Sequence, residues 1–247
     1  MNSFSLGIAS DGTGAMLQRH YIIIGSSGSK NERLCEEIRG HSPIAEVRLI
    51  LRTSFESEGV VVASWAERLV SELDAADEAA RALTEGLTAE QLNWQPAAGV
   101  WSVGQCLEHL SIFNELYLPP IAKALAGKAK GAVEEITPGW FGRFFIHNFV
   151  EPSTSQKKAG APKKIVPGSR VEISVVDRFA ASNRLAREVV RQAREYNVNQ
   201  IRFRNPLIPA IWFTTGTGLE IVSGHERRHL LQAQRVKTSA GFPRHSS

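Results

Sequence analysis

The sequence predicts an all-α protein built around an antiparallel four-helix bundle with a long crossover connection, over residues 61–238. Two observations support this fold class. Apolar residues recur at three-to-four spacing in four long segments, as on the buried face of amphipathic helices. Two helix starts also carry a Ser or Thr followed three residues later by Gln, which is the capping-box signature. Four long helices with one short and one long connection are the elements of a bundle with a crossover.

The first long helix is expected to begin at Ala63 and to end at Gly86, where a glycine favours helix termination. Its periodic apolar side chains are Trp65, Leu69, Leu73, Ala76 and Ala80. The first capping box follows, with Thr88 as the N-cap and Gln91 three residues later, and it predicts a short helix.

The second long helix is expected to start after Ser102, whose capping partner is Gln105, and to run to about Leu125. Pro119 and Pro120 should kink or break it, because a proline removes an internal hydrogen bond.

A long connector covers residues 127–168. Its aromatic part should form a short helix that packs on the bundle, and its aromatic residues are Trp140, Phe141, Phe144, Phe145 and Phe149. The third long helix is expected over Val171–Tyr196, with Ile173 and Leu185 among its apolar positions. The fourth is expected over about Thr217–Val236.

The ends of the chain do not share this pattern. Residues 1–60 mix short β-like bursts with Gly/Ser-rich spacers, so we expect an irregular, poorly ordered N-terminal extension. Residues 239–247 are expected to be a flexible tail. The early apolar burst Tyr21–Ile24 is too short for a signal peptide, and no apolar run reaches transmembrane length, so we expect a cytoplasmic protein without a membrane partner.

The formal net charge is +4, but the basic residues are dispersed over helix exteriors and one loop. A nucleic-acid-binding protein would cluster them on one element, so we expect no nucleic-acid partner. The minority interpretation of this charge is a rim that attracts an acidic substrate. A homodimer is an open alternative.

Three histidines form the candidate metal site. In the second long helix, His109 shares one side with Ser102, Cys106, Phe113 and Leu116. In the last helix His225 and His229 lie one turn apart on an otherwise apolar stripe, and Gln232 lies one turn further on. Two imidazoles on one helix and a third from a facing helix can hold one divalent ion with a coordination position left open for water or substrate. Two structural histidines in the core are the alternative.

His225 to His229 also match the H-E-x-x-H signature of zinc metalloproteases. After His229 the chain contains no Asp or Glu, and Gln232 stands where the extended signature has Gly. The protease is therefore the less favoured alternative, and Glu226 is interpreted as a surface carboxylate.

Neighbouring residues have a functional and a structural interpretation. Cys106 lies inside a helical pattern and is expected to be a buried thiol rather than a nucleophile. Glu108 is expected to face solvent. Arg228 is expected to form a surface salt bridge, with binding of a carboxylate-bearing substrate as the alternative. Gln232 is a tentative catalytic residue, or a residue that orients a ligand.

Taken together, these segments resemble the DinB/YfiT-like superfamily. The segment from Trp101 to Leu110 resembles its W-S-x-x-x-x-x-x-H-L motif, and the segment from His225 to Gln232 resembles its H-x-x-R-H-x-x-Q motif. The resemblance covers roughly residues 63–236.

The resemblance implies a four-helix bundle in which His109, His225 and His229 hold one divalent metal ion, with Zn, Ni, Fe and Mn as candidates. It implies a metal-dependent hydrolase or a low-molecular-weight-thiol S-transferase acting on a small molecule, with a thiol as one candidate. A non-enzymatic bundle that binds metal or a ligand is the alternative.

Overall fold

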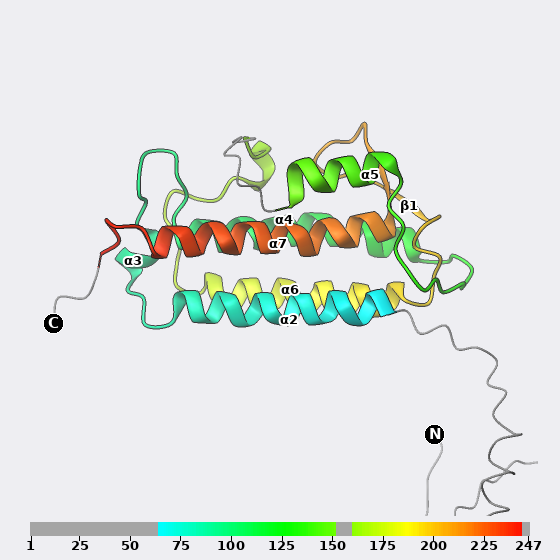
Figure 1. Ribbon diagram of the computed structural model, residues 1–247, viewed down its shortest axis with the longest axis horizontal. Helices are drawn as coiled ribbons and strands as arrows, with labels where there is room; N and C mark the ends of the chain where they lie inside the picture. The colour runs from blue at the N-terminus through cyan, green and yellow to red at the C-terminus, as the bar shows by residue number, and fades with distance from the viewer. Residues whose placement is uncertain (1–63, 152–159, 244–247) are drawn as a thin grey trace, which may run out of the picture. The chain divides into compact units, whose positions relative to one another are not determined.

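The computed structural model describes residues 64–151 and 160–243 (Figure 1). The predicted extension over residues 1–60 lies outside these ranges, so the domain boundary stays a prediction. The prediction of a helical fold is confirmed. Four long helices lie side by side: α2 (Ser64–Thr84), α4 (Val103–Leu125), α6 (Val175–Ala193) and α7 (Thr215–Lys237). Within the described part of the chain, no helix combines the length and apolarity needed to cross a membrane.

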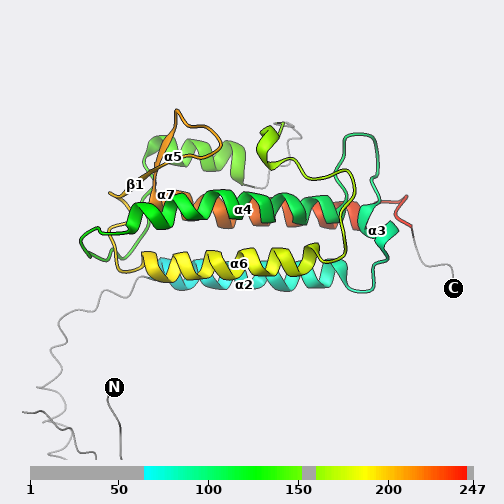
Figure 2. The ribbon, with the colours of Figure 1, turned by 180° about the vertical axis from the view of Figure 1, so that it is seen from behind.

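The four helices form a closed ring of contacts. α4 packs against α6 and α7, and α2 packs against the same two helices, whereas the pairs α2–α4 and α6–α7 make few contacts (Figure 2). Helices that follow each other in the chain therefore lie across the ring from each other, except for α4 and α6.

Contacts at the two ends of each helix pair give the directions. Arg68, near the start of α2, pairs with Glu220 near the start of α7, and the ammonium group of Lys237 donates to the carbonyl of Ala82 at the other end. α2 and α7 are therefore parallel. The rings of His109 and His229 lie 4.4 Å apart, while Ile121 lies against Gly218, so α4 and α7 are antiparallel.

α4 and α6 are parallel. Glu108 pairs with Arg178 and, further along both helices, Asn114 donates to Asn183. A parallel neighbour requires the chain to return to the starting end, and the long crossover between these two helices provides that return.

Both predicted capping boxes are present. The backbone N–H of Gln91 donates to Thr88 Oγ1 (3.2 Å) ahead of α3 (Ala89–Asn93), and the N–H of Gln105 donates to Ser102 Oγ (3.1 Å) at the start of α4. These bonds satisfy N–H groups that have no partner within the first turn of a helix. The second box fixes where α4 begins, and hence where His109 lies.

Three details of the helix prediction were wrong. α4 does not break at Pro119 and Pro120 but continues as one helix, because the fixed φ of proline is itself helical and only two N–H groups near the helix end are lost. Leu116, placed on the inward side, is exposed. The third helix begins at Val175, after Ile173, and both Ile173 and Leu185 are exposed. Their apolar character had placed them among the apolar positions of that helix.

A two-stranded antiparallel ribbon was not predicted. β1 (Arg202–Arg204) pairs with β2 (Trp212–Thr214), with Phe203 opposite Phe213. Both phenylalanines are buried, whereas their neighbours in the two strands are exposed, apart from the half-buried Thr214. Strands of three residues are too short to give a periodic signal.

The described parts of the crossover pack on α4 and α7. Its aromatic part forms α5 (Trp140–Phe145) and the π-helical turn η1 (Ile146–Val150), and η1 contacts α7. The 3₁₀ turn η2 (Lys163–Ile165) contacts α4. Gly224 allows η1 to approach closely, because a Cβ atom there would lie 2.7 Å from Val150 Cγ1.

The start of the predicted C-terminal tail contacts the helices. Phe242 packs edge-on against Trp94, with ring centroids 5.5 Å apart, and Gln91 donates to the carbonyl of Pro243 (2.8 Å). Residues 244–247 lie outside the described residues.

A chain of buried polar side chains crosses the core. Glu226 on α7 accepts a hydrogen bond from Asn114 on α4 (2.8 Å), Asn183 on α6 donates to Asp77 on α2 (2.9 Å), and Asn114 donates to Asn183 (3.2 Å). Arg187 closes the chain at Asp77 (2.9 Å). The interpretation of Glu226 as a surface carboxylate was therefore wrong: it is 1% exposed, because its side of α7 faces α4 and α6 rather than solvent.

Glu226 is expected to carry a proton at neutral pH. Burial is the main cause that raises its pKa, from 4.5 to about 8. Glu226 Oε2 and Asn114 Oδ1 both lack a partner among the described residues. A protonated Oε2 would donate a hydrogen bond and so relieve one of these two buried acceptors.

Glu226→Gln is therefore expected to fold, because a glutamine amide replaces the protonated carboxyl with a similar shape. The folded-state pKa of Glu226 lies above its unfolded value, so the contribution of Glu226 to stability is fully present below about pH 4.5 and is lost as pH rises toward about 8. The unfolding free energies of both proteins are measured by urea denaturation across this interval. As pH rises, the value for the variant minus that for wild type should increase by on the order of 1 kcal/mol per pH unit. A constant difference between the two proteins would contradict the protonated carboxyl.

Candidate metal centre

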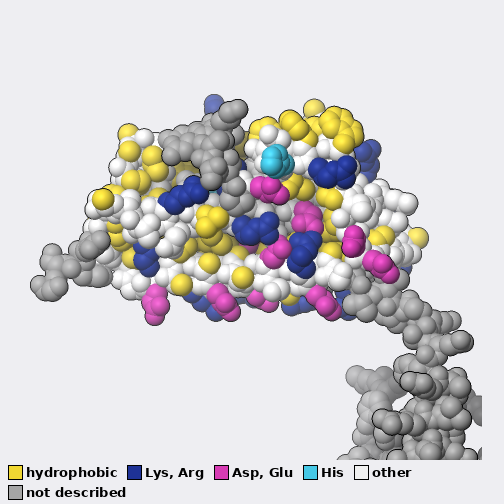
Figure 3. Space-filling model, viewed as in Figure 1, with side chains coloured by type: hydrophobic (Ala, Val, Ile, Leu, Met, Phe, Trp, Pro, Cys, Tyr) yellow, Lys and Arg dark blue, Asp and Glu magenta, His cyan; other side chains and the backbone are white. Residues whose placement is uncertain are grey.

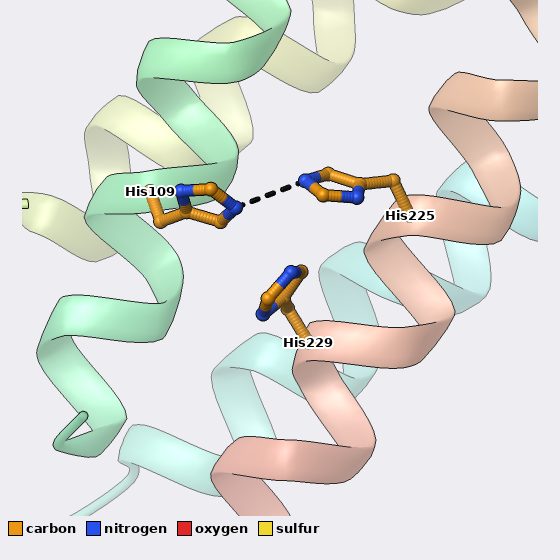
Figure 4. A group of neighbouring side chains, drawn as sticks. All are labelled: His109, His225 and His229. Atoms are coloured by element: carbon orange, nitrogen blue, oxygen red, sulfur yellow. Dashed lines mark hydrogen bonds between the residues drawn. The ribbon is translucent and has the colours of Figure 1, made fainter. Parts of the chain in front are cut away.

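Two helices bring the three predicted histidines together. His109 lies two turns into α4, and His225 and His229 occupy successive turns of α7. One ring nitrogen from each lies within 4.8 Å of the others, and the three rings converge on one point between the helices (Figure 4). The spacing of four residues on α7 does this because residues i and i+4 share one helix face.

The crossover holds His109. Its Nδ1 lies 2.6 Å from the backbone carbonyl oxygen of Ile165, which can only accept a hydrogen bond. Nδ1 therefore carries the proton, and the lone pair of Nε2 faces the other two histidines. An outer carbonyl that fixes the tautomer in this way is typical of histidines that bind a metal ion.

Gln232 plays the same part for His229. Its Oε1 lies 3.1 Å from His229 Nδ1, so this N–H donates to the amide oxygen and Nε2 is left free. His225 Nε2 lies 3.0 Å from His109 Nε2. Because the His109 nitrogen is the acceptor, His225 Nε2 is the donor here, and binding an ion would require this proton to move to Nδ1.

Aromatic side chains wall the site. The centroid of the Trp101 ring lies 4.6 Å from that of His109 and 5.7 Å from that of His229. The ring centroids of Phe113 and His225 are 4.2 Å apart. His109 and His229 are buried, and His225 is half-buried.

These surroundings keep the imidazoles neutral. Burial is the main cause that lowers the pKa of all three histidines, and it brings the pKa of His229 to about 3. The positive charge of Arg228 lowers the pKa of His225 and His229 further. Neutral imidazole is the form that binds a metal ion, so protonation of the rings does not compete with an ion at neutral pH.

The donor set fits a divalent transition metal. Ligand nitrogens around a tetrahedral zinc ion lie about 3.4 Å apart, and the separations here run from 3.0 Å to no more than 4.8 Å. Imidazole suits Zn, Fe and Ni, and three protein ligands leave a coordination position open.

The protease interpretation finds no support in the position of Glu226. In a metalloprotease the glutamate of H-E-x-x-H acts as a general base beside the metal. Here the Glu226 carboxyl is hydrogen-bonded to Asn114 inside the core.

The other predicted residues have structural partners. Cys106 is fully buried, and burial raises the pKa of its thiol to about 12, so the thiol is expected to stay protonated and to be a poor nucleophile. Glu108, expected to face solvent, is half-buried and accepts the backbone N–H of Gly168 (2.7 Å). It thus ties the crossover to α4 beside His109.

Sequence analysis missed the residues that orient or surround the histidines. Ile165 acts through its backbone carbonyl, which leaves no signal in the sequence. Phe113 was placed on the correct helix side, but its contact with His225 follows from packing between helices. Asn114 and Asn183 did carry a signal, because an asparagine within an apolar helical pattern needs a buried partner.

The sequence profile of the DinB superfamily matches residues 72–233. The chain belongs to the DinB superfamily. The match runs from α2 to α7 and includes all three histidines, and it confirms the resemblance found in the two histidine motifs. Searches of curated proteins and of solved structures gave no match.

The burial of Cys106 predicts that this thiol is unreactive in the folded protein. In a Cys35→Ser variant, in which Cys106 is the remaining cysteine, a disulfide exchange reagent should label it orders of magnitude more slowly than in guanidinium chloride. The rate can be followed by absorbance. Labelling of the native protein at the rate of a free thiol would mean that Cys106 is accessible and available for chemistry.

Proposed function

We propose that this DinB superfamily member is a metal-dependent enzyme, either a hydrolase or a low-molecular-weight-thiol S-transferase. His109, His225 and His229 would hold one divalent ion, with Zn, Ni, Fe and Mn as candidates. The observation that carries the proposal is the convergence of three neutral ring nitrogens within 4.8 Å from two helices.

The protons on two of the imidazoles support this proposal over a structural role. The Nδ1 atoms of His109 and His229 donate outward, to Ile165 and Gln232. Both Nε2 lone pairs therefore face a common point. His109 Nε2 accepts the N–H of His225 (3.0 Å), whereas no hydrogen bond within the described residues uses His229 Nε2, so this lone pair is left for an ion.

When bound, such an ion would supply Lewis acidity that lowers the pKa of a water or thiol at its open position. The chain's own residues would do the rest. Trp101 and Phe113 limit the access of bulk water to the three rings. Gln232 would hold the Nδ1 proton of His229, and we propose this orienting role for it in preference to direct catalysis.

A non-enzymatic metal-binding module is the second candidate. The walls of the site support this candidate. They are aromatic, and no carboxylate of the described residues contacts the three ring nitrogens. Metal-dependent turnover of ester or thiol-transfer substrates separates the two functions.

Metal content tests the site itself. Purified wild type should contain about one divalent ion per chain by mass spectrometry, and His109→Ala, His225→Ala and His229→Ala should each lose it, because two imidazoles bind an ion far more weakly than three. His147→Ala is the matched control, since its ring is exposed and pairs with Glu151 outside the site. Full metal content in the His109 and His225 variants would refute the three-histidine site.

The outer hydrogen bond of His229 can be tested separately. Gln232→Leu should weaken zinc affinity by about 10- to 100-fold, the usual cost of losing an outer partner of a ligand. Gln234→Leu changes an exposed glutamine on the same helix and should leave the affinity unchanged. Competition with a chelating dye measures both. Equal affinities in the two variants would show that Gln232 does not orient the ligand.

A further inference from the structure

Arg228 is a half-buried charged side chain on the same helix as two of the histidines. It lies three residues after His225 and directly before His229 on α7. A cation therefore stands beside a site whose donors suit another cation.

No carboxylate in residues 64–151 or 160–243 pairs with Arg228. Its guanidinium donates from Nη1 to the backbone carbonyl of Glu151 (3.1 Å), which is a neutral group. The Glu151 carboxylate contacts His147 instead (3.3 Å). The neighbouring Arg227 behaves differently, because it forms an ion pair with Glu72 (2.8 Å). The expected surface salt bridge of Arg228 is thus absent from the described residues.

The nearby crossover adds further basic side chains. Lys163 and Lys164 are exposed on η2, directly before Ile165, whose carbonyl holds His109. The sequence contains no Asp or Glu between Glu151 and Glu172. Carboxylates lie nearby as well, because Glu108 binds the N–H of Gly168 and Glu151 follows η1, and the face drawn in Figure 3 carries both basic and acidic side chains.

These charges decide what the open position would bind best. Three neutral imidazoles leave the charge of a divalent ion unneutralised, and Arg228 adds to it, so the site gains most from an anionic partner. We propose that the substrate is a small acidic molecule whose oxyanion group, a carboxylate or a phosphate, binds the guanidinium of Arg228. One of the five N–H donors of the guanidinium is used by Glu151, which leaves others to form charge-assisted hydrogen bonds.

This inference rests on the proposed metal site, so metal content is measured first. Protein loaded with cobalt is then titrated with mercaptopropionate and with mercaptopropanol, and the visible cobalt spectrum reports binding. The two probes share a thiol and a chain length and differ in the charged group. Wild type should bind the acid more tightly than the alcohol.

The variants assign that preference. Arg228→Gln should weaken binding of the acid by about tenfold or more, the usual value of a hydrogen bond to a charged group, and should change binding of the alcohol little. Arg227→Gln, which alters a paired arginine on the same helix, should change neither. Arg228→Lys keeps the charge without the planar fork, so it should retain part of the preference.

Each failure has its own signature. Cobalt bound at one ion per chain with an acid preference that is unchanged in Arg228→Gln and in Arg228→Lys would overturn the role of Arg228 and leave the metal site intact. Wild type that binds no ion would overturn the metal site itself, and this inference with it. A lower melting temperature of the Arg228 variants with unchanged ligand preference would assign Arg228 to the end of η1 as a structural hydrogen bond only.

Discussion

The hydrogen bond between Asn114 and Glu226 joins α4 to α7 at the depth of the core where the histidines meet. Apolar side chains tolerate small shifts of one helix along another, but a buried polar pair does not, because separating it leaves unsatisfied groups without water. Glu226 directly follows His225, and Asn114 lies five residues after His109. The pair therefore fixes the register in which the two helices present their imidazoles to each other.

The outer hydrogen bonds of the site come from two kinds of element. Gln232 belongs to the same helix as His229, so this bond forms with the helix itself. Ile165 belongs to the crossover, so the orientation of His109 depends on how that connection is anchored. Glu108 supplies an anchor by accepting the N–H of Gly168. The site thus combines His229, whose partner lies on its own helix, with His109, whose orientation depends on the crossover.

Much of this arrangement could be predicted from the sequence because it is local. A capping box and a helical period are each contained within one segment, so both helix starts and the three histidines were found without the structure. The errors concern relations between segments. Glu226 was assigned to the surface because a helical wheel shows which side a residue is on, but not how many neighbours surround the helix. The Ile165 carbonyl and the β1–β2 ribbon depend on contacts that no single segment encodes.

The order of the helices around the ring bears on how the protein acquires its site. α2 and α4 are consecutive but make few contacts, and the same holds for α6 and α7. Neither pair can form a self-sufficient hairpin early in folding, and the contacts that bury α4 join segments far apart in the chain. During synthesis His109 emerges well before the two histidines of α7. The three histidines therefore come together only after the last helix has docked, so uptake of the proposed ion would be a late event and would report on completed folding.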